Sequence, residues 1–266
     1  MSEIILSKYF CKRVEKILLS FLSTKLKMVF PVKVPYTVSA DISKYQGVPF
    51  NVHPNQFYLD QKKKELLQTK GVVAQLNDAG LYVKMASQYC GRAAIDQIDL
   101  LATHFEEDLA VLHKGQLAAI CFCFPSGFVP AEKIGQNFYA LHLPVADGQT
   151  LRASSDKVTQ VISREGSMFR RYVWTISSLG SLSQHPSYVR PMPGSIEDLY
   201  FRTETQTTVG LGEDVCLFFV KVDMRPLTEV WLDQEKKQTI KASINSMTED
   251  TLTYKNLHHI KQIINQ

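Results

Sequence analysis

The 266-residue sequence predicts an α+β fold in which about five mostly antiparallel strands form one sheet with flanking helices. Five strand-like runs lie in the middle of the chain, and segments with a helical spacing of apolar residues lie before, between and after them. These runs do not alternate regularly with helices, as they would in a doubly wound parallel sheet. The pattern therefore favours α+β over α/β.

The chain begins with a basic amphipathic stretch, "EIILSKYFCKRVEKILLSFLSTKLKMVF", in which lysines and apolar residues interleave at helical spacing. Such a helix could lie on a membrane surface. It could also pack on its own domain or on a neighbouring subunit, which we favour. No small-residue cleavage site of a signal peptide follows it.

Residues 31–54 are rich in proline and turn residues and predict an irregular segment that wraps over the surface. The next stretch, "YLDQKKKELLQTK", predicts a helix, because Leu59, Leu66 and Leu67 share a face opposite the charges. Residues 108–113 and 116–124 flank Lys114-Gly115, which is the spacing of a tight hairpin. The second of these runs is apolar almost throughout, as in a strand covered on both faces.

The remaining elements follow from the same rules. Helices are predicted at 130–135, at 148–163 (through Leu151, Val158, Val161 and Ile162) and in the tail from 225 to the end; strands are predicted at 168–177, 199–210 and 215–224.

Composition limits the class of function. The chain is 45% hydrophobic with a net charge of +4, and it carries no RRM, zinc-finger or glycine-rich phosphate signature, so no nucleic-acid partner is expected. No run of eighteen apolar residues predicts a membrane span. The five cysteines include no C-x-x-C pair, which is typical of buried thiols in a reducing compartment and indicates a cytoplasmic protein.

One histidine lies in an unusual context. In "NFYALHLPVADG", His142 stands between two leucines with a proline two residues on. It could lie in a solvated loop, which would not need the leucines, or in a buried element, where both ring nitrogens need partners. It could also be a ligand to a group held in an apolar pocket. The residues alone favour a structural histidine.

Polar residues alternate in "LYFRTETQTTVG". Arg202, Glu204 and Gln206 share one face of the predicted strand and threonines occupy the other. A solvated face explains the pattern slightly better than an inward one, although the next strand, "VCLFFVKV", is strongly apolar.

Other charged and titratable residues favour simpler interpretations. Glu132 and Lys133 fit charge placement at a helix start. His258 and His259 are adjacent and would point in different directions on a helix, so a shared zinc ion is not expected.

Several segments in a fixed order carry a resemblance. "EDLAVL", "AICFCFPSGFVPAEKIGQNFYALHLPV", "FRRYVWTI" and "FRTETQTTVGLGEDVCLFFVKVDMRPL" together resemble the haem-dependent oxidative N-demethylase family, whose type member is the alpha subunit of dimethylamine monooxygenase. The resemblance covers roughly residues 45–235. Each segment alone is weak, and their combination is specific.

The resemblance implies a single PAS-like domain that holds haem b and removes a methyl group from a small secondary amine with oxygen. It divides the chain into an N-terminal helix and wrapping segment (1–44), a haem-binding core (45–235) and a helical tail (236–266). His142 matches the family's box histidine and becomes the expected iron ligand. Arg202, Glu204 and Gln206 match the family's polar strand and become the expected catalytic residues.

The resemblance also implies roles and partners. Glu204 would hold the substrate ammonium, Arg202 would pair with a haem propionate or a polar intermediate, and Gln206 would orient either one. Because no Rossmann or iron–sulfur signature is visible, electrons would come from a separate reductase, and a homo-oligomer is compatible with the chain. Three positions depart from the family pattern, namely Val173, Thr205 and Leu211-Gly212.

Two other classes of function stay open. The chain could be a non-catalytic PAS-like module that binds haem or another ligand, although no output segment accompanies the core. It could also be a partner-binding subunit with an empty pocket. Haem binding by the purified protein separates the last class from the others.

Overall fold

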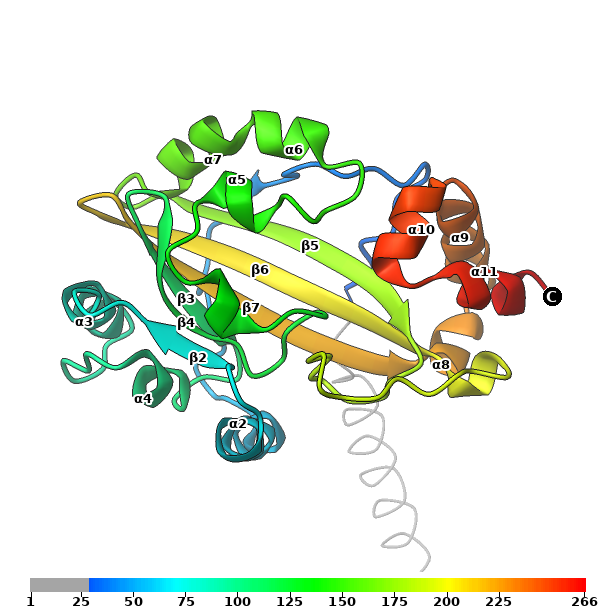
Figure 1. Cartoon of the computed structure of the whole chain (residues 1–266), viewed down its shortest axis with the longest axis horizontal. Coiled ribbons are helices and arrows are strands. Elements are labelled where there is room, and N and C mark those ends of the chain that lie inside the picture. Colours follow the sequence, from blue (N-terminus) through cyan, green and yellow to red (C-terminus); the bar gives the residue numbers. More distant parts are fainter. Residues whose placement is uncertain (1–28) are drawn as a thin grey trace, which may run out of the picture. The chain divides into compact units, whose positions relative to one another are not determined.

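We describe residues 29–266 of a computed structural model of the chain, in which residues 31–266 form one compact unit. The predicted basic N-terminal helix lies outside the described residues. The α+β prediction is confirmed: one open antiparallel sheet of seven strands is flanked by helices (Figure 1). The strands are β1 Ser43–Lys44, β2 Val73–Gln75, β3 Asp108–His113, β4 Gln116–Cys121, β5 Met168–Ser177, β6 Tyr200–Gly212 and β7 Val215–Pro226.

The strand order across the sheet is β1-β5-β6-β7-β3-β4-β2, so the expected five strands are joined by one short strand at each edge. Both additional strands have three residues or fewer, which is too short for a period-two pattern to be visible in the sequence. The PAS-like description and the domain boundaries at residues 44 and 235 stay predictions.

The long strands β5, β6 and β7 form the centre of the sheet and agree with the predicted runs. Registers run from Met168↔Val209 to Ser177↔Tyr200 between β5 and β6. The β3–β4 hairpin is confirmed as well: Lys114 and Gly115 both have positive φ, at 48° and 75°, as a two-residue type I′ turn requires.

Helices cover the two faces of the sheet differently (Figure 1). One face packs on α3 (Gly80–Tyr89) and α4 (Ile98–Ala102), with Leu109, Val111, Leu217 and Phe219 in the shared core. The other face packs near its upper end on α5 (Phe138–Leu141) and α7 (Ser155–Ile162). The predicted helix at 148–163 is broken at Ser154 into α6 (Gln149–Ala153) and α7.

The apolar face predicted for residues 58–70 is confirmed only in part. Helix α2 (Gln56–Gln68) exists and Leu66 packs against the core, but Leu67 is 87% exposed, whereas Lys62 and Glu65 are buried. The Nζ of Lys62 lies 3.5 Å from the Asp108 carboxylate and donates to backbone carbonyls. Specific pairing of charged groups thus adds to apolar burial on this helix.

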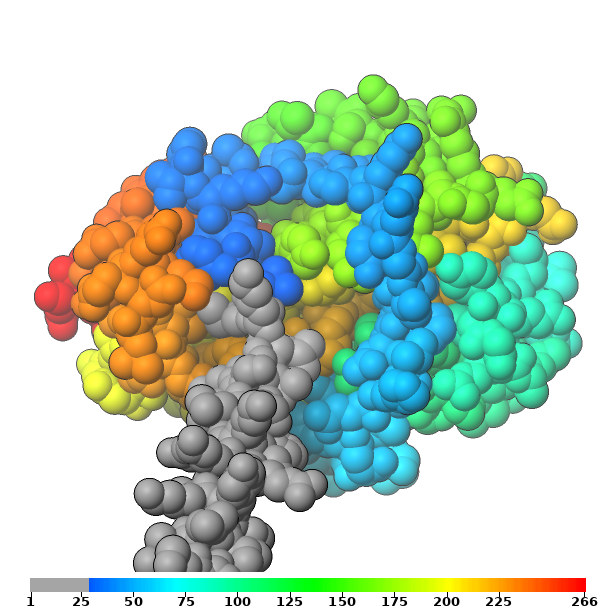
Figure 2. Space-filling model, turned by 180° about the vertical axis from the view of Figure 1, so that it is seen from behind, coloured from blue at the N-terminus to red at the C-terminus, as the bar shows by residue number. Residues whose placement is uncertain are grey.

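The remaining segments match their predictions. The tail is helical, as expected: α8 Leu227–Trp231, α9 Gln234–Asn245, α10 Glu249–Lys255 and α11 His258–Asn265. The proline-rich segment wraps around the β5 edge of the sheet. Ala40 and Ile42 pack on the apolar cluster under α7, whereas Phe50 packs on the cluster under α3 and α4, on the opposite face of the sheet. Figure 2 shows it as a blue band across the back of the molecule.

Within residues 29–266, no helix is long and apolar enough to cross a membrane. The cysteines of this part of the chain are all free thiols, buried at 121, 123 and 216 and half-buried at 90.

Candidate functional site

Strand β6 places Arg202, Glu204 and Gln206 on one face, and that face is not solvated. Arg202 is 2% exposed and Glu204 is 8% exposed, so the interpretation as a solvated strand is wrong. In register, Glu204 lies opposite Val173 of β5 and Val222 of β7. The Glu204 carboxylate therefore lies between apolar neighbours, which makes its ionic pairing within the row important.

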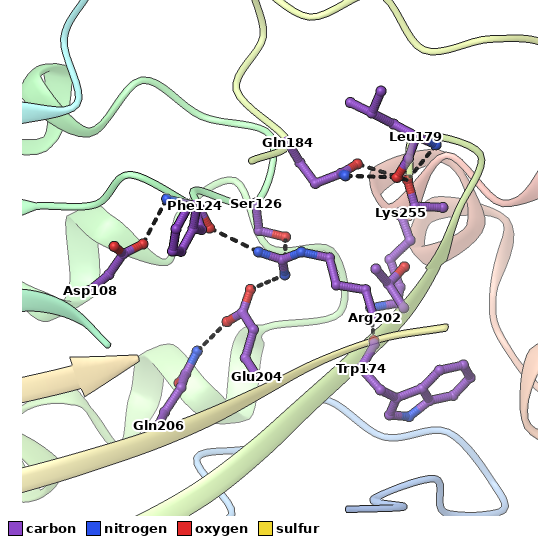
Figure 3. A network of polar contacts seen from close by, with 12 residues as sticks. Asp108, Phe124, Ser126, Trp174, Leu179, Gln184, Arg202, Glu204, Gln206 and Lys255 are labelled. Atoms are coloured by element: carbon purple, nitrogen blue, oxygen red, sulfur yellow. Dashed lines mark hydrogen bonds and ion pairs between the residues drawn. The ribbon is translucent and has the colours of Figure 1, made fainter. Parts of the chain in front are cut away.

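The row is internally hydrogen-bonded (Figure 3). Nη1 of Arg202 donates to Oε1 of Glu204 and also, at 3.3 Å, to Oγ of Ser126. Nε2 of Gln206 donates to the other carboxylate oxygen of Glu204 at 2.7 Å. Nη2 of Arg202 donates to the Phe124 carbonyl at 2.9 Å. Both oxygens of Glu204 thus have a fixed donor.

These contacts decide the ionisation of Glu204. Burial raises the pKa of its carboxyl, but the charge and hydrogen bond of Arg202, the Gln206 hydrogen bond and the charge of Arg171 lower it more. The net pKa lies below the ordinary value, so Glu204 is an anion at neutral pH.

Arg171 belongs to the same face and was missed by the sequence interpretation. It lies directly opposite Gln206 in the β5–β6 register. Its Nε is buried without a hydrogen-bond partner. The period-two spacing in "FRRYVW" placed Arg170 and Arg171 on opposite faces, but only the β5–β6 pairing shows which of them joins the row.

Lys255, the last residue of α10, is a second charged group that the sequence did not indicate. Its Nζ donates to the Trp174 carbonyl at 2.9 Å and lies 5.4 Å from the centroid of the Tyr36 ring. Burial lowers the pKa of Lys255 from 10.5 to about 8, and the charge of Glu204 opposes this shift. The site thus gathers cations from β5, β6 and α10.

His142 is the C-cap residue of α5 and is held in place by local chemistry. Asn137 caps the helix start, because its side chain accepts a hydrogen bond from the Ala140 N–H at 2.9 Å. Pro144 two residues after His142 cannot continue the helix. Arg152 donates to the His142 carbonyl at 3.2 Å and fixes the following turn.

Of the two ring nitrogens of His142, only Nδ1 is held by a hydrogen bond. Nδ1 lies 2.7 Å from the Phe138 carbonyl, and the ring stacks on the Phe138 ring with centroids 4.1 Å apart. Nε2 has no hydrogen-bond partner in the described part of the chain. Burial lowers the pKa of His142, with the charges of Arg171 and Arg152 acting in the same direction. The neutral tautomer with Nδ1–H therefore presents the Nε2 lone pair.

The charge of Arg171 affects both His142 and the polar row. The Arg171 guanidinium acts electrostatically on both the His142 ring and the Glu204 carboxylate. Half-buried phenylalanines, Phe122 and Phe218, lie on the same face of the sheet and pack near Leu141, the residue before His142. One face therefore combines a free imidazole nitrogen, an ionised carboxylate and flat apolar side chains.

Two cavities lie near the candidate residues in the described part of the chain. One of about 400 Å³ lies between the β3–β4 turn, α5 and α7, and is lined by Lys114, Phe138 and Thr159. One of about 280 Å³ lies between the wrapping segment and β5, and Arg171 lines it. Neither is lined by His142 or Glu204, so the chemistry of the row and not cavity size defines the candidate site.

Other candidate residues do not join it. Glu132 is exposed and Lys133 half-buried on a 3-10 helix (Pro130–Lys133), as charge placement at a helix start predicts. His258 contacts Thr253 and His259 contacts the Pro193 carbonyl. Within residues 29–266 no three His, Cys, Asp or Glu side chains gather as a metal-binding cluster.

The fold and site are those of an α+β protein with a buried ion-pair row beside a histidine that has one free ring nitrogen. Residues 50–265 match the family described as haem-dependent oxidative N-demethylase, alpha subunit-like. The chain therefore belongs to this family, and the resemblance stated from its motifs is confirmed. No curated protein matches the chain significantly.

The family name implies haem, and the residues present fit one. An axial histidine in haem proteins uses one ring nitrogen and donates the other N–H to a backbone carbonyl or carboxylate, which is the arrangement at His142. The buried Nε of Arg171 is an unused donor for an acidic group. Phe122 and Phe218 supply apolar surface on the same face.

Proposed function

We propose that this protein binds haem b through Nε2 of His142 and oxidatively demethylates a small secondary amine. The observation that supports it most is the Arg202–Glu204–Gln206 row with its buried ion pair, which shares its sheet face with Arg171, whose charge lowers the pKa of His142. A structural strand does not need an ionised carboxylate between valines. A site that selects a protonated amine does.

Glu204 is the proposed amine-binding group. A small dialkylamine is mostly protonated at neutral pH, and a carboxylate can accept a further charge-assisted hydrogen bond beside those it already has. Arg202 and Gln206 hold one oxygen each, so the carboxylate is oriented before the amine arrives. Because the row is buried, this orientation costs little at the moment of binding.

Arg202 is assigned to holding Glu204. It is enclosed, and its two terminal nitrogens donate to Glu204, Ser126 and the Phe124 carbonyl, whereas its Nε is buried without a hydrogen-bond partner. This enclosure supports the pairing role over a contact with a haem propionate. Gln206 is half-buried and completes the orientation of Glu204 from the open end of the row.

The haem, when bound, supplies oxygen activation and electron uptake. The protein residues supply position: His142 anchors the iron side, Glu204 holds the amine nitrogen, and Val173 and Val222 form apolar walls beside Glu204. Val173 stands where the family pattern has an asparagine. Because Val173 lies opposite Glu204, this difference from the family pattern affects which amine fits beside the carboxylate. The difference at Thr205 does not, because Thr205 points to the other face of the sheet.

Electrons are proposed to come from a separate reductase, in keeping with the words "alpha subunit-like" in the family description. We further propose that the protein is cytoplasmic, because its buried free thiols stay reduced in that compartment. A homo-oligomer is compatible with the chain. The alternative remains a haem-binding module that does not turn over.

Titration with hemin tests the proposal. The protein should bind it near one to one and give a Soret band, and a secondary amine such as dimethylamine should shift that band. Glu204→Gln should keep the hemin stoichiometry but weaken the amine-dependent shift about tenfold or more, because one charge-assisted hydrogen bond is lost. The matched control is Glu213→Gln in the β6–β7 turn, which should respond like wild type.

Each outcome has a definite meaning. A wild-type protein that takes up no hemin refutes the proposal. A hemin complex that responds to no secondary amine leaves the non-catalytic module. An equal response of wild type and Glu204→Gln moves amine binding away from Glu204.

A further inference from the structure

The Arg171 guanidinium has no partner of its own. It makes no hydrogen bond or ion pair with any residue in the described part of the chain, and its Nε is buried. Its neighbour Arg170, on the opposite face, donates from Nε to Thr207 at 2.9 Å and lies 3.4 Å above the Tyr45 ring. Arg171 is half-buried and only its Nε is enclosed, so its terminal nitrogens stay open to a ligand.

The charges around Arg171 leave a positive excess. Arg171, Arg202 and Lys255 act on a single carboxylate, Glu204, so the site carries three cations against one anion. Asp41 also acts on Arg171, but it is already paired with Lys33. Two positive charges therefore remain uncompensated, and an ammonium bound at Glu204 would add a third.

The geometry of the free group indicates what it binds. A guanidinium presents a planar fork of N–H donors that matches a carboxylate with two parallel hydrogen bonds. Arg171 also lines, together with Arg170, the 280 Å³ cavity between the wrapping segment and β5, so space adjoins it. Arg202 cannot take this role as readily, because Glu204 and Phe124 already occupy its fork.

We propose that Arg171 is the carboxylate-binding residue of this site. The carboxylate has two sources, a propionate of the haem or an acid group on the amine ligand, and both would offset the positive excess. This inference deepens the proposed function and rests on it for the identity of the ligand, but the anion-binding property of Arg171 can be measured without haem.

The first measurement separates the two sources with Arg171→Gln. Hemin and hemin dimethyl ester, whose propionates carry no charge, are titrated into wild type and variant. If the propionate is the source, the variant binds hemin about tenfold or more weakly and the ester unchanged. If the ligand supplies the carboxylate, hemin binding is unchanged, and the Soret shift with N-methylglycine is weakened while that with dimethylamine is not.

Arg170→Gln is the matched control, because it removes the same charge one residue away on the opposite face. It should change none of these affinities. Arg171→Gln should fold as well as wild type, since Arg171 makes no hydrogen bond or ion pair within the described residues, so loss of binding cannot be attributed to unfolding.

A second measurement distinguishes failure of this inference from failure of the proposed function. Without haem, acetate should raise the Tm of wild type and Arg170→Gln more than that of Arg171→Gln. A protein that takes up no hemin but shows this difference refutes the proposed function and keeps the inference. If Arg171→Gln matches wild type with hemin, N-methylglycine and acetate alike, the inference is wrong.

Discussion

The Asp108 carboxylate accepts a hydrogen bond from the Phe124 N–H at 2.7 Å, and this contact fixes the loop that holds Arg202. The other oxygen of Asp108 accepts from the Cys123 N–H at 3.0 Å. The Phe124 carbonyl in turn accepts from Arg202 at 2.9 Å (Figure 3). Behind Asp108 lies Lys62, 3.5 Å away, so a line of alternating charges and dipoles runs from α2 to the candidate site.

Asp108→Asn should therefore destabilise the protein strongly. Burial raises the pKa of Asp108, and Lys62 and the two backbone N–H groups offset much of that cost. An amide can accept at one oxygen only, so its NH₂ would face a backbone N–H, and Lys62 would lose its counter-charge. We expect a loss of about 3–5 kcal/mol in the free energy of unfolding, measured by urea denaturation.

The control for this prediction is Asp96→Asn. Asp96 and Lys84 form an exposed pair at 3.6 Å, with side chains 54% and 45% exposed, so its loss should cost less than about 1 kcal/mol. Equal losses for the two variants would contradict a structural role of the Asp108 network.

Glu107 should give the protein a measurable pH dependence. Burial raises the pKa of its carboxyl from 4.5 to about 7, opposed by the Asn51 N–H, and Oε2 is buried without a hydrogen-bond partner. The folded state therefore keeps a proton that the unfolded state releases near pH 4.5. Between pH 4.5 and about 7 the folded state binds more protons, so the free energy of unfolding falls as pH rises.

Glu107→Gln should remove this part of the pH dependence, because the amide does not ionise. At neutral pH the variant should be more stable than wild type by up to about 3 kcal/mol, and the two should converge toward pH 4. Urea denaturation at a series of pH values measures the difference. The exposed Glu132→Gln should run parallel to wild type, and a Glu107→Gln curve parallel to wild type would show that Glu107 titrates normally.

Much of the sheet was predictable because its central strands carry strong patterns. The apolar run of β7 and the alternation of β6 identified both strands, and Lys114-Gly115 identified the hairpin. The edge strands β1 and β2 were not predicted, because two or three residues are too few to show the alternation of apolar and polar residues that identifies a strand. Helix α2 has about its predicted length, and Leu66 packs on the core, but the burial of Lys62 was not predictable, since its acceptors come from residues 40 or more positions away.

The candidate site was predictable only in part. The spacing of Arg202, Glu204 and Gln206 placed them on one face, but their burial depends on a carbonyl 78 positions away, at Phe124. Arg171 and Lys255 were missed for the same reason, because strand pairing and the position of α10 bring them to the row. Side chains whose partners lie far along the chain leave no local pattern.

His142→Ala should lose haem while the protein stays folded. The ring contributes one contact to the Phe138 carbonyl and a stack on the Phe138 ring, so truncation should cost about 1–2 kcal/mol, too little to unfold a sheet of this size. The proposed coordinate bond from Nε2, by contrast, has no substitute on α5. We expect the Soret band to be weakened or displaced at unchanged circular dichroism.

A sharper form of this experiment uses His142→Gly with added imidazole. The removed side chain leaves room on the stacking face of Phe138, so free imidazole can occupy the axial position and restore the wild-type Soret maximum. His185→Ala is the informative comparison, because Nε2 of His185 is buried and lacks a hydrogen-bond partner. His113→Ala serves as a second one, since His113 stacks on Tyr82 at 3.9 Å and lies on the α3 side. If His142→Ala keeps the wild-type spectrum and His185→Ala loses it, the iron ligand is His185, and the candidate site must be moved to the loop after β5.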